Sequence, residues 1–454
     1  MQNPPRGRLM LFYALPALAL GLPTIPVYIY LPTLYASQPG LSLAAIGGTL
    51  LAARLFDTLS DPLAGFLSDR FPLGGNYRKP WIAAGALLGG AGLFHLLTPP
   101  ADAGAGYLML WSVILYAGWT LVSVPYLAWG AELVPGYHDR TRITAWREGL
   151  GILGIAAAGL LGAVATGGGG SEREAATLIA WCTVIAGSLT IPVLLWRVPD
   201  AGLNRPRTGM ARRPDWRGQW RSLMRNRLFM RLLSAWFVNG LANGIPAVLF
   251  FLYMEHALGI GEQGRSLMVL LYFLSAIAAM PLWTAASRRF GKHRVWCWAM
   301  LAACTAFAAV PFLSHGNETA FAVICIITGV ALGADLALPP AIQADVADHD
   351  SLRCGHARTG LLFALWSMAS KLALAAAAGL ALGGAQLLGF DPAVPTGSGI
   401  MALTGIYALV PLAIKLAAIA LMWRFPLTAA RHDIIRRRLA GGPVNRQSRK
   451  GTFT

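Results

Sequence analysis

RLFDTLSDPLAGFLSDR, residues 54–70, directly follows the apolar run LSLAAIGGTLLAA. Together the two stretches read as one membrane span whose second half contains Asp57 and Asp61, one helical turn apart. An ionisable side chain at the centre of a span costs about 2.5–3.5 kcal/mol on insertion scales. Arg54, Asp57 and Asp61 are spaced three and four residues apart, so they project from one face of a helix. This face must point into a helix bundle or a water-filled cavity rather than toward lipid.

The composition identifies the rest of the chain as a membrane protein. Its 454 residues are 56% hydrophobic and 13% charged, with a mean hydropathy of +0.55, whereas a soluble protein carries about 25% charged residues. Apolar runs of about 20 residues, the length that crosses a bilayer, recur along the chain. We predict an all-α membrane protein with twelve spans, near residues 10–34, 41–66, 80–98, 106–133, 144–167, 175–196, 232–254, 266–287, 295–313, 320–344, 359–388 and 401–423.

The basic residues predict the topology. With the N-terminus inside, 32 of the 37 Lys and Arg residues lie on the termini and on alternate, cytoplasmic loops. Arg173 and Arg265 lie on the opposite side, and three basic residues lie within spans. Because Lys and Arg are retained on the cytoplasmic side, both termini are predicted to be cytoplasmic. The net charge of +17 is then a topology signal, and no nucleic-acid partner is expected.

The N-terminal stretch and the cysteines argue against a secreted protein and against a disulfide-linked or cysteine-based metalloprotein. The first apolar stretch is too long for a signal-peptide core and lacks a cleavage-site pattern, so it reads as a span. The five cysteines have no CxxC spacing, so neither a disulfide nor a cysteine-based metal site is expected.

The longest hydrophilic stretch, between the sixth and seventh spans, divides the chain. We predict an N-terminal six-helix bundle (1–197), a basic cytoplasmic loop (198–231), a C-terminal six-helix bundle (232–424) and a basic cytoplasmic tail (425–454). Two such bundles with a solute site between them are typical of secondary transporters. The chain has no G-x-x-x-x-G-K-[ST] motif, so an ion gradient rather than nucleotide hydrolysis is the expected energy source.

Four blocks resemble one family. ARLFDTLSDP is similar to the second-helix motif A-R-x-x-D-x-x-x-D-P of the glycoside-pentoside-hexuronide:cation symporters, the melibiose permease family of the major facilitator superfamily, which includes animal lysolipid transporters. VPYLAWGAELVPGYHDRTRITAWREG, ADLALPPAIQADVADHD and GLLFALWSMASKLAL follow in the family's order and cover nearly the whole chain. The resemblance implies the major facilitator fold of two six-helix bundles. It also implies that Asp57 and Asp61 hold the coupling Na⁺, Li⁺ or H⁺.

The loop after the second span resembles a signature of the whole superfamily. GFLSDR followed by Arg78 and Lys79 is similar to G-x-L-x-D-R-x-G-R-K with a short insertion. In the superfamily this loop braces neighbouring helices at the cytoplasmic side. The implied structural residues are Gly65, Asp69, Arg70, Arg78 and Lys79.

Two carboxylates one turn apart repel each other. Either a monovalent cation such as Na⁺ compensates Asp57 and Asp61, or one of them takes a proton. In the functional interpretation Arg54 takes part in coupling. In the alternative, structural interpretation, Arg54 neutralises one aspartate and holds two helices together. We expect Lys371 to approach the two aspartates across the halves and to compete with the cation, because a buried ammonium needs a carboxylate partner. In the alternative interpretation, the side chain of Lys371 snorkels toward a membrane surface. We expect such snorkelling of Lys415.

The chain departs from the family at several positions. Relatives have an aspartate just before the proline of the fourth span, where this chain has Ser123, with Thr120 one turn earlier. These hydroxyls are the expected further cation ligands, and the loss of a third carboxylate favours H⁺ or a weakly held Na⁺. The first span, ALPALALGLPTIPVYIYLP, lacks the acidic residue that takes the sugar's hydroxyls in melibiose permeases, so transport of melibiose itself is not expected.

Polar and aromatic residues in the motif spans are candidates for the solute site. Aromatic faces suit a pyranose ring or an acyl chain, and amides suit hydroxyl groups. For three of the candidates the sequence also allows a structural role. Asn239 and Asn243 could join helices by hydrogen bonds rather than bind solute, and Arg147 could pair with Glu148. The predicted solute-binding residues are Tyr126, Arg147, Asn239, Asn243, Asp335 and Trp366.

These observations predict a secondary active transporter rather than an enzyme. We expect a monomeric, multi-pass protein of the cytoplasmic (inner) membrane that symports a sugar, glycoside or related solute with H⁺ or Na⁺ by alternating access, without another cofactor. A lysolipid or amphiphile carrier is the alternative that the aliphatic first span favours. An integral-membrane transferase would need clustered His, Asp or Glu at one membrane face, and the only such cluster is ADVADHD with His356.

Overall fold

The protein is a bundle of long helices in the computed structural model. The structure describes residues 6–24, 26–27, 31–36, 43–72, 75–100, 102–134, 136–167, 171–200, 216–390 and 396–440. The first part contains α1 (Arg6–Ala14), α2 (Pro16–Gly21), α3 (Leu31–Ala36), α4 (Leu43–Arg70), α5 (Lys79–Leu97), α6 (Ala105–Leu133), α7 (Tyr137–Gly167) and α8 (Glu172–Arg197). The second part contains α9 (Trp216–Met224), α10 (Arg227–His256), α11 (Glu262–Phe290), α12 (Lys292–Ala309), η3 (Val310–Phe312), α13 (Glu318–Cys354), α14 (Thr359–Leu387), α15 (Gly397–Thr404), η4 (Gly405–Leu409), α16 (Val410–Met422) and α17 (Ala429–Ala440).

Among the described residues, ten helices are long and apolar enough to cross a membrane. They are α5, α6, α7, α8, α10, α11, α12 with η3, α13, α14 and α15–η4–α16. The other two predicted spans correspond to α4 and to the N-terminal segment. The helix α4 is 28 residues long but carries Arg54, Asp57 and Asp61 along one face, which we call the charged stripe. In the N-terminal segment a shorter apolar helix covers Gly7–Gly21, and part of the predicted span 10–34 lies outside the described residues.

Local sequence signals set several helix ends. The side-chain oxygen of Ser171 accepts a hydrogen bond from the backbone N–H of Glu174 at the start of α8, and Thr396 caps α15 in the same way through Gly399. Such caps satisfy backbone donors that have no partner within the helix. The helix α13 ends at Gly355, whose φ of 76° is the left-handed conformation that favours glycine.

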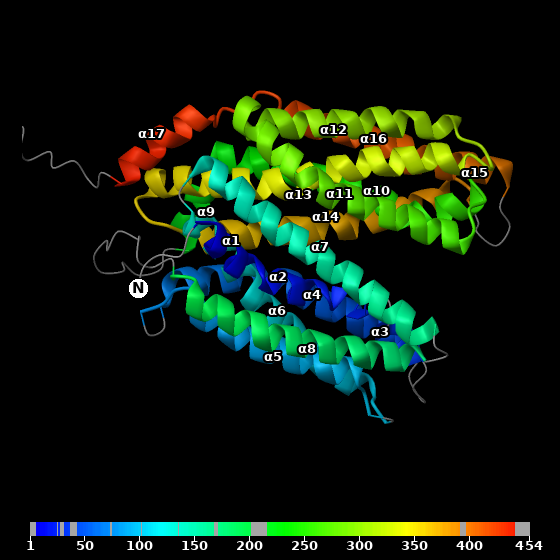
Figure 1. Ribbon diagram of the computed structural model, residues 1–454, viewed down its shortest axis with the longest axis horizontal. Coiled ribbons are helices and arrows are strands. Elements are labelled where there is room, and N and C mark those ends of the chain that lie inside the picture. The colour runs from blue at the N-terminus through cyan, green and yellow to red at the C-terminus, as the bar shows by residue number, and fades with distance from the viewer. Residues whose placement is uncertain are drawn as a thin grey trace, which may run out of the picture.

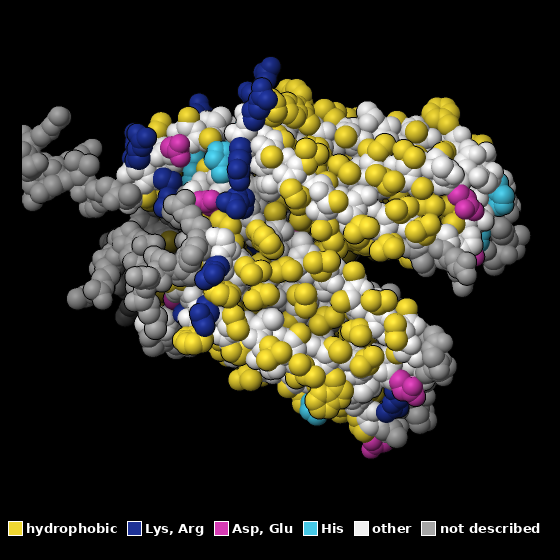
Figure 2. Space-filling view, viewed as in Figure 1, with side chains coloured by type: hydrophobic (Ala, Val, Ile, Leu, Met, Phe, Trp, Pro, Cys, Tyr) yellow, Lys and Arg dark blue, Asp and Glu magenta, His cyan; other side chains and the backbone are white. Residues whose placement is uncertain are grey.

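The helices form two halves that meet at one end of the molecule (Figure 1). α1–α8 make up the N-terminal half and α10–α16 the C-terminal half, and the main contacts between them are α4 with α14, α7 with α13 and α11, and α6 with α14. We call the end that carries α9 and α17 the closed end. At the opposite, open end the halves diverge and a wedge-shaped cleft separates them in the space-filling view (Figure 2).

Glycine permits the close contact at the closed end. A Cβ on Gly65 of α4 would lie 2.5 Å from the backbone oxygen of Gly360 in α14. Because real Cβ atoms do not approach an oxygen so closely, both helices need glycine here to touch.

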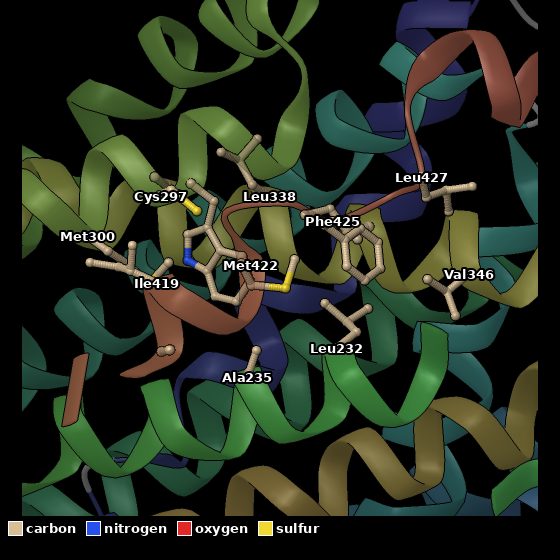
Figure 3. Close-up of a cluster of buried hydrophobic side chains, with 14 of the residues drawn as sticks. Leu232, Ala235, Cys297, Met300, Leu338, Val346, Ile419, Met422, Phe425 and Leu427 are labelled. Atoms are coloured by element: carbon tan, nitrogen blue, oxygen red, sulfur yellow. The ribbon is translucent and has the colours of Figure 1, made fainter. Parts of the chain in front are cut away.

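The C-terminal half has an extended apolar core near the closed end (Figure 3). Leu232 and Ala235 of α10, Leu338 of α13 and Met422 of α16 are buried in it, and Phe425 continues it beyond α16. This core joins the helices that also carry the buried polar groups described below.

Candidate functional site

The two aspartates of α4 point into the protein interior. Asp57 is 3% exposed and Asp61 is fully buried. The hydroxyl of Thr120 on α6 lies 3.2 Å from Asp57 Oδ1 and 3.0 Å from Asp61 Oδ1. A hydroxyl has one proton to donate, so Thr120 ties the two carboxylates together without satisfying both. Ser60 lies 3.3 Å from the Thr120 oxygen and adds a hydroxyl that sequence reasoning missed.

Lys371 of α14 reaches across the halves to these carboxylates. Its Nζ lies 2.8 Å from Asp57 Oδ1 and 2.9 Å from Asp61 Oδ2, and it donates to Asp61 Oδ1 at 3.0 Å. The lysine side chain is 23% exposed, whereas both carboxylates are nearly inaccessible. The ammonium therefore occupies the position between the carboxylates that a small cation would need.

The formal charges of this cluster do not cancel. Asp57 and Asp61 contribute two negative charges and Lys371 one positive charge, so these three residues together carry one net negative charge. Burial disfavours an uncompensated charge, so the site favours the uptake of a proton or a monovalent cation.

The other two predicted residues stand one turn away on the same two helices, Ser123 on α6 and Arg54 on α4. The Ser123 hydroxyl is buried and makes no hydrogen bond within the part of the chain that the structure describes. The half-buried Arg54 places its guanidinium over the ring of Tyr116, 5.1 Å from the ring centroid.

Asn239, Asn243 and Asp335 belong to a second polar cluster, inside the C-terminal half. Asp335 Oδ2 accepts from the amide nitrogens of Asn239 at 3.2 Å and Asn243 at 2.8 Å. Lys415 Nζ donates to the amide oxygens of the same two residues, at 3.1 and 2.6 Å, and lies 3.6 Å from Asp335. Trp296 donates its indole N–H to the other oxygen of Asp335.

This cluster corrects one expectation. Lys415 does not snorkel, because it is 8% exposed and bonded to groups in the protein interior. The amides of Asn239 and Asn243 join helices by hydrogen bonds, as in the alternative interpretation, and solute binding by these two residues stays a prediction. The sequence signal that was available is the presence of one acid, Asp335, and two lysines, Lys371 and Lys415, within spans of the same half, since each needs a partner.

The remaining solute-site candidates are packed in this conformation. Tyr126 stacks on Tyr13 with ring centroids 4.7 Å apart and donates its hydroxyl to the Tyr13 carbonyl at 2.6 Å. Trp366 stacks on Trp236 with centroids 4.4 Å apart.

Arg147 is also packed, since it is 6% exposed and pairs with Glu148, the alternative partner considered from the sequence. Arg147 still lines a narrow pocket between the halves, together with Tyr13, Thr144 and Phe363.

The loop motif residues join the halves at the closed end. Asp69 accepts hydrogen bonds from the backbone N–H groups of Gly360 and Leu361, both at 2.9 Å, at the start of α14. These N–H groups have no partner within the helix and carry the positive end of its dipole. The buried Arg78 pairs with Asp69 and with Glu132, each at 2.7 Å. Burial lowers the pKa of Arg78, but the two carboxylates raise it more, so the net direction is upward and Arg78 is charged.

The other two basic residues of the motif contact aromatic rings. Arg70 lies over Phe66 and Lys79 over Trp129, each 5.9 Å from the ring centroid.

A second ionic contact joins the halves at the same end. Arg140 of α7 pairs with Asp345 at 3.2 Å and Asp348 at 2.9 Å, both on α13. Lys292 of α12 also binds Asp345, and the fully buried His432 of α17 lies 3.1 Å from Asp348. Sequence reasoning missed Lys292 and His432, because both stand in basic segments predicted to be cytoplasmic, where basic residues serve as a topology signal.

The chain is similar to known transporters along most of its length. Residues 12–429 match the family described as MFS/sugar transport protein. The chain is 23% identical over 416 residues to the glucuronide carrier protein homolog of Escherichia coli, with 88% of each protein covered. It is 25% identical over 379 residues to the sphingosine-1-phosphate transporter MFSD2B of Mus musculus, covering 75% of this chain and 72% of that protein.

A solved structure shows the same fold. The Escherichia coli fucose:proton symporter FucP superposes with a TM-score of 0.68 at 14% identity, covering 93% of this chain and 99% of that one. The resemblance to the glycoside-pentoside-hexuronide:cation symporters is confirmed by the family match and by relatives named as symporters. The chain therefore belongs to the MFS/sugar transport protein family, and it is a multi-pass inner-membrane transporter of the major facilitator superfamily rather than an enzyme.

Proposed function

We propose that the protein is a cation-coupled symporter of a sugar, glycoside or related polar solute, driven by H⁺ or Na⁺. The observation that carries this proposal is the position of Lys371, which bridges Asp57 and Asp61 where the halves meet. The carboxylates belong to one half and the ammonium to the other, so binding of a cation between the carboxylates and movement of the halves act on the same contacts.

The proposed topology has twelve membrane helices and both termini in the cytoplasm. The closed end is then cytoplasmic, in agreement with its excess of Lys and Arg. The two additional helices are α4 and the N-terminal segment, and the charged stripe of α4 does not oppose this assignment, because it faces Lys371 and Thr120 rather than lipid.

In the proposed cycle this conformation faces outward. Solute enters the cleft at the open end (Figure 2), and a cation displaces Lys371 from Asp57 and Asp61. The halves then separate at the closed end, which requires that Asp69 leave the start of α14 and that Arg140 leave α13. Solute and cation are released together on the cytoplasmic side, and the empty carrier returns with Lys371 back between the carboxylates.

The substrate class proposed first is a glycoside, since a relative is named a glucuronide carrier homolog. The buried Arg147 between the halves is a suitable partner for an anionic or hydroxylated solute. A lysolipid or amphiphile is the second candidate. It is favoured by the acid-free first span and by the similarity to the mouse sphingosine-1-phosphate transporter.

Uptake into proteoliposomes tests both proposals. The purified protein is offered labelled glucuronides, glucosides, pentosides, lysophospholipids and sphingosine-1-phosphate, each with an imposed Na⁺ gradient, an imposed H⁺ gradient or neither. We expect uphill accumulation of one glycoside class with one gradient, and its loss in Asp57→Asn and Asp61→Asn. Accumulation that is independent of both gradients refutes coupling, and lysolipid uptake without glycoside uptake selects the second candidate.

A further inference from the structure

The cluster around Asp335 and Lys415 has no role in the proposed cycle. It holds one negative and one positive charge, and its hydrogen bonds are mutually satisfied through Asn239, Asn243 and Trp296. It therefore needs no further ion. Yet a buried ion pair stabilises a protein little more than an apolar replacement of the same shape, so a contribution to stability alone is a weak reason for its presence.

The cluster fixes the position of α10 within the C-terminal half. Asn239 and Asn243 project from one face of α10, and each bonds both to Asp335 of α13 and to Lys415 of α16. One turn nearer the closed end, Ala235, Leu338 and Ile419 of the same three helices are buried in the apolar core (Figure 3). The directional bonds set the rotation and height of α10, which apolar packing alone sets less sharply.

An adjacent face of α10 sets the position of α14. A Cβ on Gly240 would lie 3.0 Å from the Cβ of Ala373, and one on Gly244 would lie 2.5 Å from the Cβ of Ala377. Because each of these glycines directly follows one of the two asparagines, a rotation of α10 that displaces the amides also displaces this tight contact. The two helices are thus coupled in register.

A polar contact joins α10 and α14 one turn nearer the closed end. Trp236 of α10 donates its indole N–H to Ser370 Oγ at 2.6 Å, and its ring stacks on Trp366. Ser370 directly precedes Lys371. The chain of contacts from the Asp335–Lys415 pair therefore ends at the residue whose ammonium lies between Asp57 and Asp61.

We propose that Asp335 and Lys415 are positioning residues that, through α10 and α14, hold the Lys371 ammonium between Asp57 and Asp61 and thereby set the affinity of the site for its cation. This inference rests on the proposed function, in which Lys371 and the cation compete. Loosening the cluster moves the ammonium away from the carboxylates, so the cation binds more tightly, and removal of Lys371 sets the limit of this effect.

Thermal stability of the purified protein tests this without a solute. Melting temperatures are measured over a NaCl titration balanced with choline chloride at fixed pH, and over a pH series without Na⁺. A cation that binds the folded protein raises the melting temperature once its concentration exceeds the dissociation constant, so the Na⁺ concentration or pH at which the rise begins, its onset, reports affinity. Loss of this dependence in the Asp57→Asn and Asp61→Asn variants assigns it to the site.

Two perturbations loosen the register at different places. The double variant Asp335→Leu/Lys415→Met removes both charges, so no lone charge is left buried, and Gly244→Ala forces α10 and α14 apart directly. Tyr253→Phe is the matched control, because it removes a buried hydrogen bond, to Val310 at 3.2 Å, from the far end of the same helix.

We expect the onset to move toward tighter cation binding in both perturbed proteins, at least threefold downward in Na⁺ concentration or half a unit upward in pH. The control should keep the wild-type onset. In a Lys371→Ala background the same changes should produce no further shift, because the residue through which they act is gone.

The inference is wrong if the double variant and Gly244→Ala lower the melting temperature at every cation concentration and leave the onset of the rise unchanged, since that is the signature of a structural role. It is equally wrong if the shift persists in the Lys371→Ala background. A wild-type protein whose stability depends on neither Na⁺ nor pH through Asp57 and Asp61 refutes the proposed cation site itself, and the inference with it.

Discussion

Replacing Asp69 with alanine should shift the protein out of the conformation described above. The Asp69 carboxylate accepts hydrogen bonds from the backbone N–H groups of Gly360 and Leu361, and both bonds exist only while α4 and α14 are in contact. A hydrogen bond to a charged group contributes about 1.5–3 kcal/mol. Loss of the two bonds therefore removes at least about 3 kcal/mol from this conformation alone, which is about a 100-fold change in the equilibrium between outward and inward states.

Distances between spin labels measure this equilibrium. With the five native cysteines replaced, labels on Arg173→Cys at the start of α8 and Glu255→Cys near the end of α10 report the separation of the halves at the open end. We expect long distances in the parent protein and a population at shorter distances in Asp69→Ala. Glu132→Gln is the control, because Glu132 also pairs with Arg78, a residue of its own half. If Asp69→Ala and Glu132→Gln give the same distances as the parent, the bonds to α14 do not hold the closed end and the reasoning fails.

Three further outcomes follow from the site. Asp57→Asn and Asp61→Asn should each abolish uphill accumulation in proteoliposomes while solute exchange without a gradient survives, and uphill transport by either variant would remove that carboxylate from coupling. Thr120→Val should weaken cation activation of uptake about tenfold, since it removes one hydrogen bond of about 1.5 kcal/mol to the carboxylates, whereas Ser123→Ala, which changes a hydroxyl outside the cluster, should leave activation unchanged. Gly65→Ala should populate the inward state in the spin-label assay, because its Cβ would meet the Gly360 oxygen at 2.5 Å. Unchanged distances would show that α4 and α14 make room for this Cβ without opening the closed end.

The sequence predicted the contact of Lys371 with Asp57 and Asp61 because its physical signal is local. Two acids at helical spacing within an apolar span must be buried, and a lysine within a span of the other half must have a partner. Thr120, one turn from the family position, followed from the same motif. Their meeting at 2.8–3.2 Å agrees with those expectations.

The second cluster was not predicted, because a sequence does not state which buried polar group bonds to which. Lys415 stands alone in its span, and the amides of Asn239 and Asn243 suit a solute as well as another helix. Only the packing of α10, α13 and α16 brings these residues to Asp335.

The helix α13 is longer than the predicted tenth span. Hydropathy places the end of the tenth span near residue 344, yet α13 continues to Cys354. The helix extends past the apolar run because Asp345 and Asp348 on its next turn pair with Arg140 across the halves. Hydropathy detects the thickness of the membrane and not the length of a helix that projects beyond it.

The placement of charges on opposite halves gives the proposed cycle its coupling. Opening the closed end carries Lys371 away with α14 and leaves Asp57 and Asp61 behind on α4. Without a cation, this step leaves two negative charges in a buried site, and with one bound it leaves a single negative charge. The cost of an uncompensated buried charge is several kcal/mol. A bound cation therefore lowers the free energy of the inward state relative to the outward state. By linkage, the inward state binds the cation more tightly than the outward state does, because in the outward state the cation must displace Lys371. The Asp335–Lys415 pair lies wholly within one half, so opening separates none of its charges. Its ions can remain paired throughout transport, and this is why a neutral cluster is suited to hold a helix in register while the negatively charged cluster is suited to carry an ion.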